Sequence, residues 1–365
     1  MKLARVLILA EVTAFVVSTA GAQEGWIQTD PLTRPRSFHT MTVLIDGRVL
    51  AAGGVLQDGI TGTAELYDPV AATWRVTDSM LTNRANYTAT LLPSGQVLVV
   101  GGETDGFPFA SREAELFDPD TEQWISTSSL SVARAWHTAT LLPSGQVLVA
   151  GGSASGHYAG EAELYDPMTG TWSSAGTLAE ARAQTTATLL PDGRVFFAGG
   201  FGQGGTQLSS VEVFHSDSGQ WTTAPPLISP RVGHTATLLP TGNILIAAGW
   251  LDGVNLRAAE LYDPETGMTV ETGSLSLGRY FHAAYILPSG AVLVTPGRNG
   301  STTGEIYDPA SGQWRSIGDP AIPRNIPSSA LLNSGQVLVA GGRQQPNPFE
   351  PDYPVEWSDV FTEAM

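Results

Sequence analysis

The sequence has no cysteine and almost no lysine. Lys2 is the single lysine among 18 basic residues, and the others are arginine. Without cysteine the chain cannot hold a disulfide framework. Its 35 acidic residues leave a formal net charge of −17. Such a charge opposes binding to nucleic acid or to an anionic membrane, because phosphate recognition needs surplus positive charge.

Long apolar runs are absent after Ala22, so no transmembrane segment is expected beyond that point. The N-terminal segment, 1–22, combines a basic start, "MKLAR", a mostly apolar run, "VLILAEVTAFVV", and the small residues Ala20-Gly21-Ala22. This pattern predicts a signal peptide over residues 1–22, cleaved before Gln23. Glu11 interrupts the apolar run, and an uncleaved N-terminus or a membrane anchor is the alternative. Export without cysteine favours a secreted or periplasmic bacterial protein.

Glycine and proline, by contrast, are abundant at 41 and 24 residues, and the glycines recur at a regular distance. The phrase "HTATLLPSGQVLVAGG" at 137–152 returns almost unchanged as "YTATLLPSGQVLVVGG" at 87–102. Seven such units align on the second glycine of a pair, at spacings of 45 to 50 residues. These glycines are Gly54, Gly102, Gly152, Gly200, Gly249, Gly297 and Gly342. Seven units with a period near 50 residues indicate a propeller or a similar array.

Each unit predicts four short strands. "HTATLL" is the first, "QVLVAGG" follows a Pro-Ser-Gly turn, "AELYDP" is the third, and the stretch around a tryptophan is the fourth. Because the first two strands are apolar almost throughout, we expect both of their faces to be buried. A four-stranded sheet packed between similar sheets is a propeller blade. The expected fold class is therefore all-β, a seven-bladed β-propeller.

The two ends of the chain are expected to close the ring. The seventh unit stops after its third strand and lacks its tryptophan. Trp26 precedes Gly54 by the same distance along the chain as Trp74 precedes Gly102, and the other units keep this distance. Residues 25–30 should therefore form the outer strand of the last blade, so that no sheet edge is open at the seam. One domain, residues 23–365, is expected after the signal peptide.

An arginine and an acid also repeat in every unit. The arginine lies 18 residues before the glycine, at Arg36, Arg84, Arg134, Arg182, Arg231, Arg279 and Arg324. The acid follows the glycine, at Glu65, Glu115, Glu163, Glu212, Glu260, Glu305 and Asp359. In an antiparallel blade both positions lie at the same face of the disc. A ring of arginines that binds an anion is one interpretation. A residue needed in every blade favours a structural role instead, so we expect seven buried Arg–acid pairs.

The Arg-x-x-His-Thr-Ala-Thr segment, the paired glycine, Glu-x-Tyr-Asp-Pro and the spaced tryptophan together resemble the Kelch repeat. The form of the repeat is similar to that of the galactose oxidase central domain and its bacterial relatives. The resemblance covers residues 23–365 and implies the fold, but it leaves the function open, because one fold hosts many functions. Galactose oxidase-type enzymes use copper held by Tyr and His with a Tyr–Cys crosslink. A chain without cysteine cannot form that crosslink, so neither copper oxidase activity nor a cofactor is expected.

Four units carry a histidine three residues after the arginine, namely His39, His137, His234 and His282. Each of these histidines belongs to a different blade. Zinc ligands must lie within about 2.0–2.1 Å of one ion, so no metal site is expected from them. We expect these side chains near the rim of the central channel.

The variation in unit length falls between the second and third strands. The glycine-to-acid distance runs from 8 to 17 residues, whereas the tryptophan-to-glycine distance is constant. Seven variable loops on one face of a rigid scaffold are the expected layout of a recognition surface. The candidate binding residues in these loops are Asp58, Asp105, Phe107, Phe109, His157, Tyr158, Phe201, Trp250, Asp252, Arg298, Arg343 and Tyr353. Aromatic side chains with scattered acids and arginines suit a sugar or a peptide.

Three functions remain open at this point. The favoured one is an exported, monomeric, non-catalytic module that binds a protein or a carbohydrate through the variable loops. The second is a cofactor-free sugar mutarotase, as the resemblance to exported Kelch sialic-acid epimerases implies. It would need an arginine and an acid or histidine that converge, and Arg298, His157 and Asp252 are the candidates. The third is a stalk or assembly domain without a small ligand.

Overall fold

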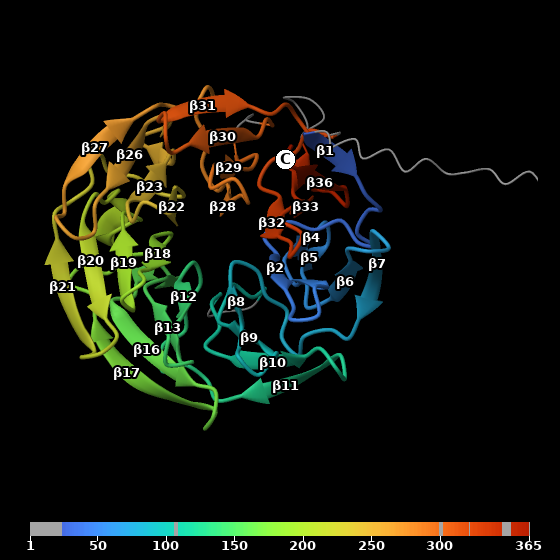
Figure 1. The fold of residues 1–365 in the computed structure, drawn as a ribbon. Coiled ribbons are helices and arrows are strands. Elements are labelled where there is room, and N and C mark those ends of the chain that lie inside the picture. Colours follow the sequence, from blue (N-terminus) through green and yellow to red (C-terminus); the bar gives the residue numbers. More distant parts are fainter. Residues whose placement is uncertain (1–23, 106–108, 299–301, 321, 345–351, 365) are drawn as a thin grey trace, which may run out of the picture.

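The computed structural model describes residues 24–105, 109–298, 302–320, 322–344 and 352–364. Seven four-stranded antiparallel sheets stand around a central axis as the blades of a propeller (Figure 1). Among the described residues the only helical segment is the short 3-10 turn η1 (Gln203–Gly205). No helix in this part of the chain is long and apolar enough to cross a membrane. The predicted all-β, seven-bladed fold is confirmed.

In each blade the strands follow one another from the channel to the rim. Blade 1 holds β2 (Thr40–Val43), β3 (Val49–Ala52), β6 (Ala64–Asp68) and β7 (Thr73–Thr77). Blade 2 holds β8 (Thr88–Leu91), β9 (Val97–Val100), β10 (Ala114–Asp118) and β11 (Gln123–Thr127). Blade 3 holds β12 (Thr138–Leu141), β13 (Val147–Ala150), β16 (Glu161–Asp166) and β17 (Thr171–Thr177). Blade 4 holds β18 (Thr186–Leu189), β19 (Arg194–Ala198), β20 (Val211–His215) and β21 (Gln220–Ala224).

The last three blades repeat this order. Blade 5 holds β22 (Thr235–Leu238), β23 (Ile244–Ala247), β26 (Ala259–Tyr262) and β27 (Thr269–Thr272). Blade 6 holds β28 (Ala284–Ile286), β29 (Val292–Val294), β30 (Glu305–Asp308) and β31 (Gln313–Ser316). Blade 7 holds β32 (Ser328–Leu331), β33 (Val337–Ala340), β36 (Ser358–Thr362) and β1 (Gly25–Gln28).

Four of the variable loops form small hairpins, which the sequence did not predict. They are β4–β5 (Val55–Leu56 with Gly59–Ile60), β14–β15 (Ser153–Ala154 with His157–Tyr158), β24–β25 (Trp250–Leu251 with Val254–Asn255) and β34–β35 (Arg343–Gln344 with Tyr353–Pro354). Asp252 and Gly253 join β24 to β25 with φ of 47° and 85°. Positive φ at both turn residues matches the twist of the flanking strands, so this turn fixes the hairpin.

The prediction that the two inner strands are buried on both faces holds for the second strand only. All four residues of β9 are buried, as are those of β13 and β23. All four residues of β8 are half-buried, because the first strand of each blade forms the wall of the channel. The first strand therefore has one face that packs inside the propeller and one face that lines the channel.

The N-terminal strand closes the ring, as predicted. β1 pairs antiparallel with β36, with Trp26 opposite Phe361. At the rim, Arg315 of blade 6 donates two hydrogen bonds to Glu24, over 2.5 and 2.7 Å. The first and last described segments thus lie side by side in one sheet.

Each repeated arginine is buried and forms an ion pair with the acid of its own blade. The exposed fraction of these arginines is 0–1%. The pairs are Arg36–Glu65, Arg84–Glu115, Arg134–Glu163, Arg182–Glu212, Arg231–Glu260, Arg279–Glu305 and Arg324–Asp359. Arg134 Nη1 also donates to the carbonyls of Gly151 and Glu161 over 2.9 and 2.8 Å. Arg36, Arg84, Arg182, Arg231 and Arg279 donate to the equivalent carbonyls of their blades, so these arginines connect the start of the first strand with both ends of the variable loop.

Candidate functional site

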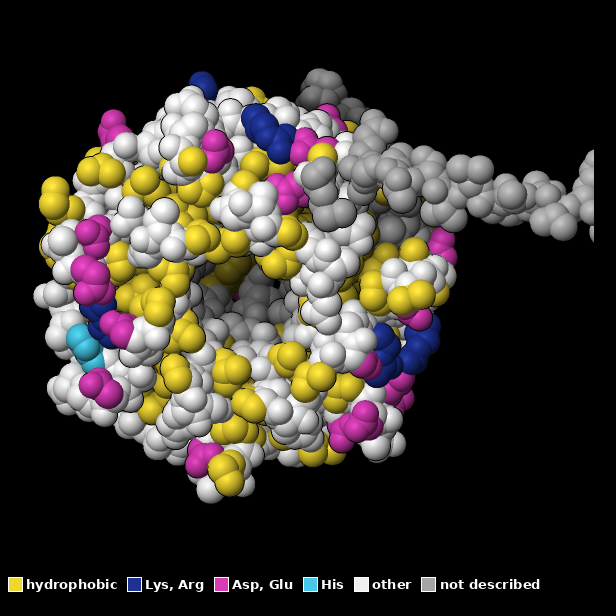
Figure 2. Space-filling view, viewed as in Figure 1, with side chains coloured by type: hydrophobic (Ala, Val, Ile, Leu, Met, Phe, Trp, Pro, Cys, Tyr) yellow, Lys and Arg dark blue, Asp and Glu magenta, His cyan; other side chains and the backbone are white. Residues whose placement is uncertain are grey.

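The variable loops and one mouth of the central channel share a face of the disc. In each blade the residue after the arginine forms a bridge with the residue after the paired glycine, for example Ala135 with Ser153 and Tyr280 with Arg298. The segment that leads into the innermost strand therefore lies beside the start of a variable loop. In the view along the propeller axis, the ring leaves an opening at its centre (Figure 2).

Seven residues around this mouth adopt the left-handed backbone conformation, with φ from 42° to 59°. Each lies two residues after the arginine, and they are Phe38, Asn86, Trp136, Gln184, Gly233, Phe281 and Ile326. The N–H of Trp136 donates to the carbonyl of Asn86, and that of Gln184 to the carbonyl of Trp136, both over 3.0 Å. These bonds join equivalent residues of successive blades. The left-handed backbone conformation is therefore part of the hydrogen bonding that connects neighbouring blades.

The left-handed conformation does not explain which side chains stand at these seven positions. Glycine takes the left-handed conformation freely and Asn tolerates it, whereas a bulky residue costs about 1–2 kcal/mol. Gly233 and Asn86 fill two of the positions at little cost. Phe38, Trp136 and Phe281 instead place large aromatic rings there. Strain that the scaffold does not require is typical of functional sites.

These aromatic side chains come from blades 1, 3 and 6 and meet over the channel. The ring centroids of Phe38 and Trp136 are 6.1 Å apart with the rings edge to face, and those of Trp136 and Phe281 are 5.4 Å apart with the rings stacked. Tyr280 lies 4.9 Å from Phe281, and the Arg298 guanidinium lies 5.9 Å from the Tyr280 ring. We call Phe38, Trp136, Phe281 and Tyr280 the mouth aromatic row.

Glu103, in the variable loop of blade 2, fixes the centre of this row. Its Oε1 accepts a hydrogen bond from Trp136 Nε1 over 2.7 Å, and its Oε2 accepts one from Asn86 Nδ2 over 2.8 Å. The carboxylate is thus engaged by two donors and orients the indole. One variable loop therefore positions the side chains of two neighbouring blades.

A cavity of about 310 Å³ lies at the mouth. It is lined by Phe38, His39, Thr40, Asn86, Tyr87, Trp136, His137, Gln184, Thr185, Gly233, His234, Phe281 and His282. Among these described lining residues there is no Asp, Glu, Lys or Arg. The cavity therefore combines aromatic surface with side-chain amides, hydroxyls and imidazoles.

Three of the four histidines of the cavity are hydrogen-bonded to the preceding blade, a contact that we call the latch. The Nε2 atoms of His137, His234 and His282 are hydrogen-bonded with the hydroxyls of Thr88, Thr186 and Thr235, over 2.9, 3.1 and 3.0 Å. Tyr87 takes the same role, with its hydroxyl accepting from Thr40 over 2.9 Å. These contacts hold neighbouring innermost strands together.

Burial keeps these imidazoles neutral. Desolvation, with a contribution from the Arg134 guanidinium, lowers the pKa of His137 to about 3, and desolvation with Arg231 does the same for the pKa of His234. Burial raises the pKa of Tyr87 to about 12. Within the described residues, no three His, Cys, Asp or Glu side chains are placed to hold a metal ion. The cavity is thus an uncharged, hydrogen-bonding site.

The loop residues predicted from the sequence lie around the mouth rather than in the cavity, and none of those described lines it. Phe201 and Trp250 come together, with ring centroids 6.0 Å apart. Arg343 forms an ion pair with Asp352, and Asp105 accepts a hydrogen bond from the N–H of Ile60 over 3.3 Å. Those that are exposed are Asp58, Asp105, Phe109, His157, Asp252, Arg298 and Tyr353. Tyr158 is half-buried, and Phe107 lies outside the described residues.

The mutarotase hypothesis required Arg298, His157 and Asp252 to converge. Arg298 lies over Tyr280 in blade 6, His157 is in the hairpin of blade 3, and Asp252 is in the turn of the blade 5 hairpin. None of the three lines the mouth cavity. The sequence prediction also missed Trp136, Phe281 and Phe38. A large residue two positions after the arginine, where another unit has Gly233, was the available signal.

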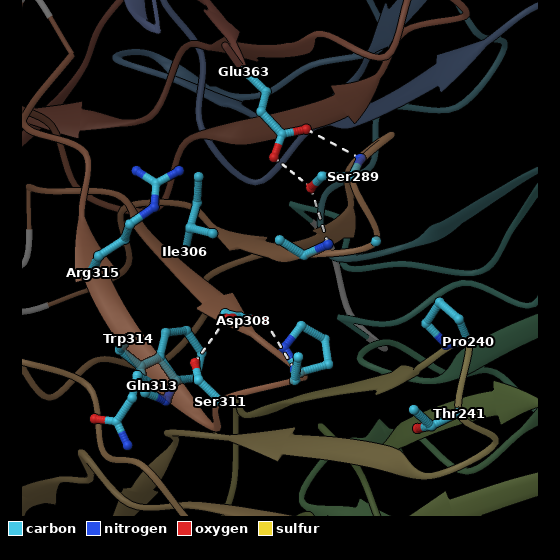
Figure 3. A pocket seen from close by; sticks show the side chains of 14 residues that line it. Pro240, Thr241, Ser289, Ile306, Asp308, Ser311, Gln313, Trp314, Arg315 and Glu363 are labelled. Carbon is cyan, nitrogen blue, oxygen red and sulfur yellow. Dashed lines mark hydrogen bonds between the residues drawn. The ribbon is translucent and has the colours of Figure 1, made fainter. Parts of the chain in front are cut away.

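A larger hollow of about 630 Å³ lies between the tight turns of blades 5 and 6, near the chain ends. Several of its polar groups are hydrogen-bonded to one another (Figure 3). Glu363 accepts hydrogen bonds from the hydroxyl and the N–H of Ser289, over 2.5 and 3.3 Å, and Asp308 accepts one from Ser311 over 2.7 Å. These contacts stabilise turns, so the mouth cavity is the better candidate for a ligand.

Comparisons with known proteins agree with this architecture. Kelch motif models match residues 84–131, 139–179 and 186–228. No curated protein matches the sequence. A fungal alcohol oxidase of the AA5 family, in complex with copper, superposes with a TM-score of 0.76 at 16% identity, over 93% of this chain and 76% of that one. YjhT superposes with a TM-score of 0.64 at 15% identity, over 80% of this chain and 99% of that one.

At these identities the structural likeness concerns the fold. The matched motifs fall in blades 2, 3 and 4, and the other four blades repeat the same arginine, glycine pair and acid with few exceptions. The chain thus carries Kelch motifs in blades 2, 3 and 4 and folds into a seven-bladed β-propeller.

Proposed function

We propose that this propeller is an exported binding protein that takes a neutral carbohydrate at the channel mouth. The observation that carries the proposal is the mouth aromatic row, because three of its four rings (Phe38, Trp136 and Phe281) stand at left-handed backbone positions that disfavour bulky side chains. Aromatic faces pack against the C–H faces of sugar rings. The amides of Asn86 and Gln184 each offer both donor and acceptor groups to hydroxyls.

The electrostatics of the cavity favour a neutral ligand. The described lining residues include no carboxylate, lysine or arginine, and the histidines are neutral at physiological pH. A charged ligand would lose hydration there without gaining an ion pair, and that loss is costly. A volume of about 310 Å³ is at the lower end for small-molecule sites, which suits one sugar unit of a chain.

Binding is favoured over catalysis by the same groups. General acid–base catalysis needs a side chain whose pKa is near the working pH. The pKa values of His137 and His234 lie at about 3 and that of Tyr87 at about 12. None of these groups exchanges a proton readily at neutral pH.

Export is part of the proposal and is supported by the N-terminal segment, 1–22, with its basic start, apolar run and small residues. Cell fractionation and N-terminal sequencing of the expressed protein test it. A mature chain that starts at Gln23 outside the cytoplasm is the expected result. Full-length protein in the cytoplasm would contradict export without bearing on the binding site.

A glycan array tests the binding proposal, with neutral and sialylated glycans probed by the purified protein. We expect binding to neutral glycans, lost in Trp136→Asn and kept in Tyr353→Asn. Tyr353 is an exposed loop aromatic outside the cavity, so it controls for a general loss of aromatic surface. Asn is tolerated in the left-handed conformation, so the fold should survive the Trp136 change. Failure of the wild-type protein to bind any glycan, with capture of a protein partner instead, would contradict the proposal.

A further inference from the structure

Among the described residues, four of the seven blade junctions around the channel have this latch. At these four junctions a side chain is hydrogen-bonded to a threonine hydroxyl of the preceding blade, and these side chains are Tyr87, His137, His234 and His282. Thr185 donates within its own blade instead, over 2.8 Å, and Pro327 has no polar side chain, so the junction of blades 7 and 1 is the one that has a histidine but no latch. His39 occupies the same position in blade 1, at the junction with blade 7. Neither of its ring nitrogens has a hydrogen-bond partner among the described residues, whereas in the other three histidines only Nδ1 lacks one.

The missing latch has a cause in the sequence. Blade 7 carries Ser328 where the latched junctions have threonine. The Ser328 hydroxyl donates instead to the backbone carbonyl of His39, over 2.6 Å. Serine lacks the second Cβ substituent that restricts the rotamers of threonine, so its hydroxyl is free to turn toward the backbone.

The His39 ring is nevertheless held in place and faces the cavity. Its exposed fraction is 5%, and it lines the cavity together with Phe38. Gly341 of blade 7 lies against the ring so closely that a Cβ there would be 2.8 Å from His39 Cε1. The ring is therefore buried, fixed and without a partner among the described side chains.

Buried polar groups nearly always have a hydrogen-bond partner, and leaving one unpaired is costly. A neutral imidazole presents one donor and one acceptor, and a hydroxyl oxygen can pair with either. We infer that His39 is the hydrogen-bonding anchor for a hydroxyl oxygen inside the channel. In the free protein that oxygen belongs to water, and in the complex it belongs to a sugar hydroxyl. The assignment to a sugar hydroxyl rests on the proposed function.

The surroundings of His39 favour a neutral partner over an anion. Burial, together with the Arg36 guanidinium, lowers the pKa of His39 well below its usual range, so the ring carries no charge. Arg36 itself is already paired with Glu65 over 2.8 Å. The site therefore offers hydrogen bonds without a net charge to attract a carboxylate or phosphate.

Two measurements test the inference. The first is a high-resolution crystal structure of the unliganded protein, in which we expect an oxygen within hydrogen-bond distance of a His39 ring nitrogen. The second is calorimetric titration with the methyl β-glycosides of glucose, galactose and mannose. We expect His39→Phe to weaken binding roughly tenfold, as for one lost hydrogen bond. His39→Gln, which keeps a polar group in reach, should recover part of that loss.

The melting temperature distinguishes a ligand-binding role of His39 from a structural role like that of His234. His39→Phe should not lower the melting temperature, because no internal hydrogen bond is lost, whereas the matched His234→Phe should lower it by breaking the Thr186 latch. A His39 ring without a neighbouring oxygen, or unchanged affinity in His39→Phe, would overturn the inference. If the wild-type protein binds none of the glycosides, the proposed function fails, and the crystal structure alone decides on His39.

Discussion

The scaffold of the blades and the channel mouth are built on the same repeat but use it in opposite ways. In the scaffold, each repeated residue makes the same contact seven times, as the buried Arg–acid pairs do. At the mouth the backbone repeats seven times while the side chains differ, from Gly233 to Trp136. The repeat therefore sets where a side chain stands, and variation at that position sets what it can bind.

The comparison also shows why a repeated strained position is useful. The left-handed positions of successive blades lie around one mouth, so residues far apart in the sequence, such as Phe38 and Phe281, become part of one surface. Most bulky residues at these positions cost stability. The closed ring, in which β1 pairs with β36, holds the backbone of these positions in place.

The largest effect is expected from breaking a scaffold pair. Arg134→Met leaves Glu163 buried without its cation and should lower the free energy of unfolding by about 3–5 kcal/mol. Urea denaturation measures the change. The matched control is Arg75→Met at the exposed pair with Glu122, where the expected loss is below about 1 kcal/mol. Equal losses in the two variants would show that burial does not distinguish these pairs.

The second effect comes from opening the ring. Deleting residues 24–28 removes β1 and the Glu24–Arg315 contact and exposes the edge of β36. The melting temperature should fall by about 5 °C or more, since several kcal/mol of strand pairing are lost and 1 kcal/mol corresponds to roughly 2–4 °C even for a domain of 150–250 residues. An unchanged melting temperature in differential scanning calorimetry would mean that the first strand does not support the fold.

The third effect is a loss of stability in mild acid. His137 and His234 have pKa values of about 3 in the folded chain, well below the usual value of 6.5. The unfolded chain therefore binds more protons between those limits, and stability falls as the pH drops from about 6.5 toward 3. Each histidine should contribute on the order of a few kcal/mol. Urea denaturation across this range should show a shallower slope for His234→Phe than for the wild type, and identical slopes would contradict the shift.

The smallest effect is expected at the mouth. Phe38→Asn relieves left-handed strain while removing half-buried ring contacts, so the free energy of unfolding should change by less than about 1 kcal/mol. Phe117→Ala, in the blade scaffold, should cost about 3–5 kcal/mol, because Phe117 is fully buried. A loss in Phe38→Asn as large as in Phe117→Ala would mean that the mouth aromatics belong to the scaffold.

The fold was predictable from the sequence because each blade repeats the contacts that make it. The spacing of Trp26 from Gly54 even indicated which strand closes the ring. The four loop hairpins were not predicted, since their strands have only two residues each and show no alternation. The half-buried first strands were misjudged because the channel face carries neutral residues that resemble those of a core.

The site was only partly predictable. Loop variation indicated the face that carries the mouth cavity, because alternation of strand direction puts the loops beside the channel mouth. The convergence of Phe38, Trp136 and Phe281 over the axis was hidden, since a linear repeat does not show that blades 1, 3 and 6 meet. The difference between His39 and His234 was hidden as well, because it depends on where the hydroxyl of Ser328 turns.

The most direct test of the central claim is calorimetric titration of the wild type, Phe281→Asn and Tyr353→Asn with the same neutral oligosaccharide, chosen from the glycan array. Stacked aromatic contacts contribute about 0.5–1.5 kcal/mol beyond their buried area. The proposal predicts that Phe281→Asn binds roughly tenfold more weakly, with an unchanged melting temperature, while Tyr353→Asn binds as the wild type does. Equal affinity of Phe281→Asn and the wild type would place the ligand elsewhere and contradict the assignment of the channel mouth.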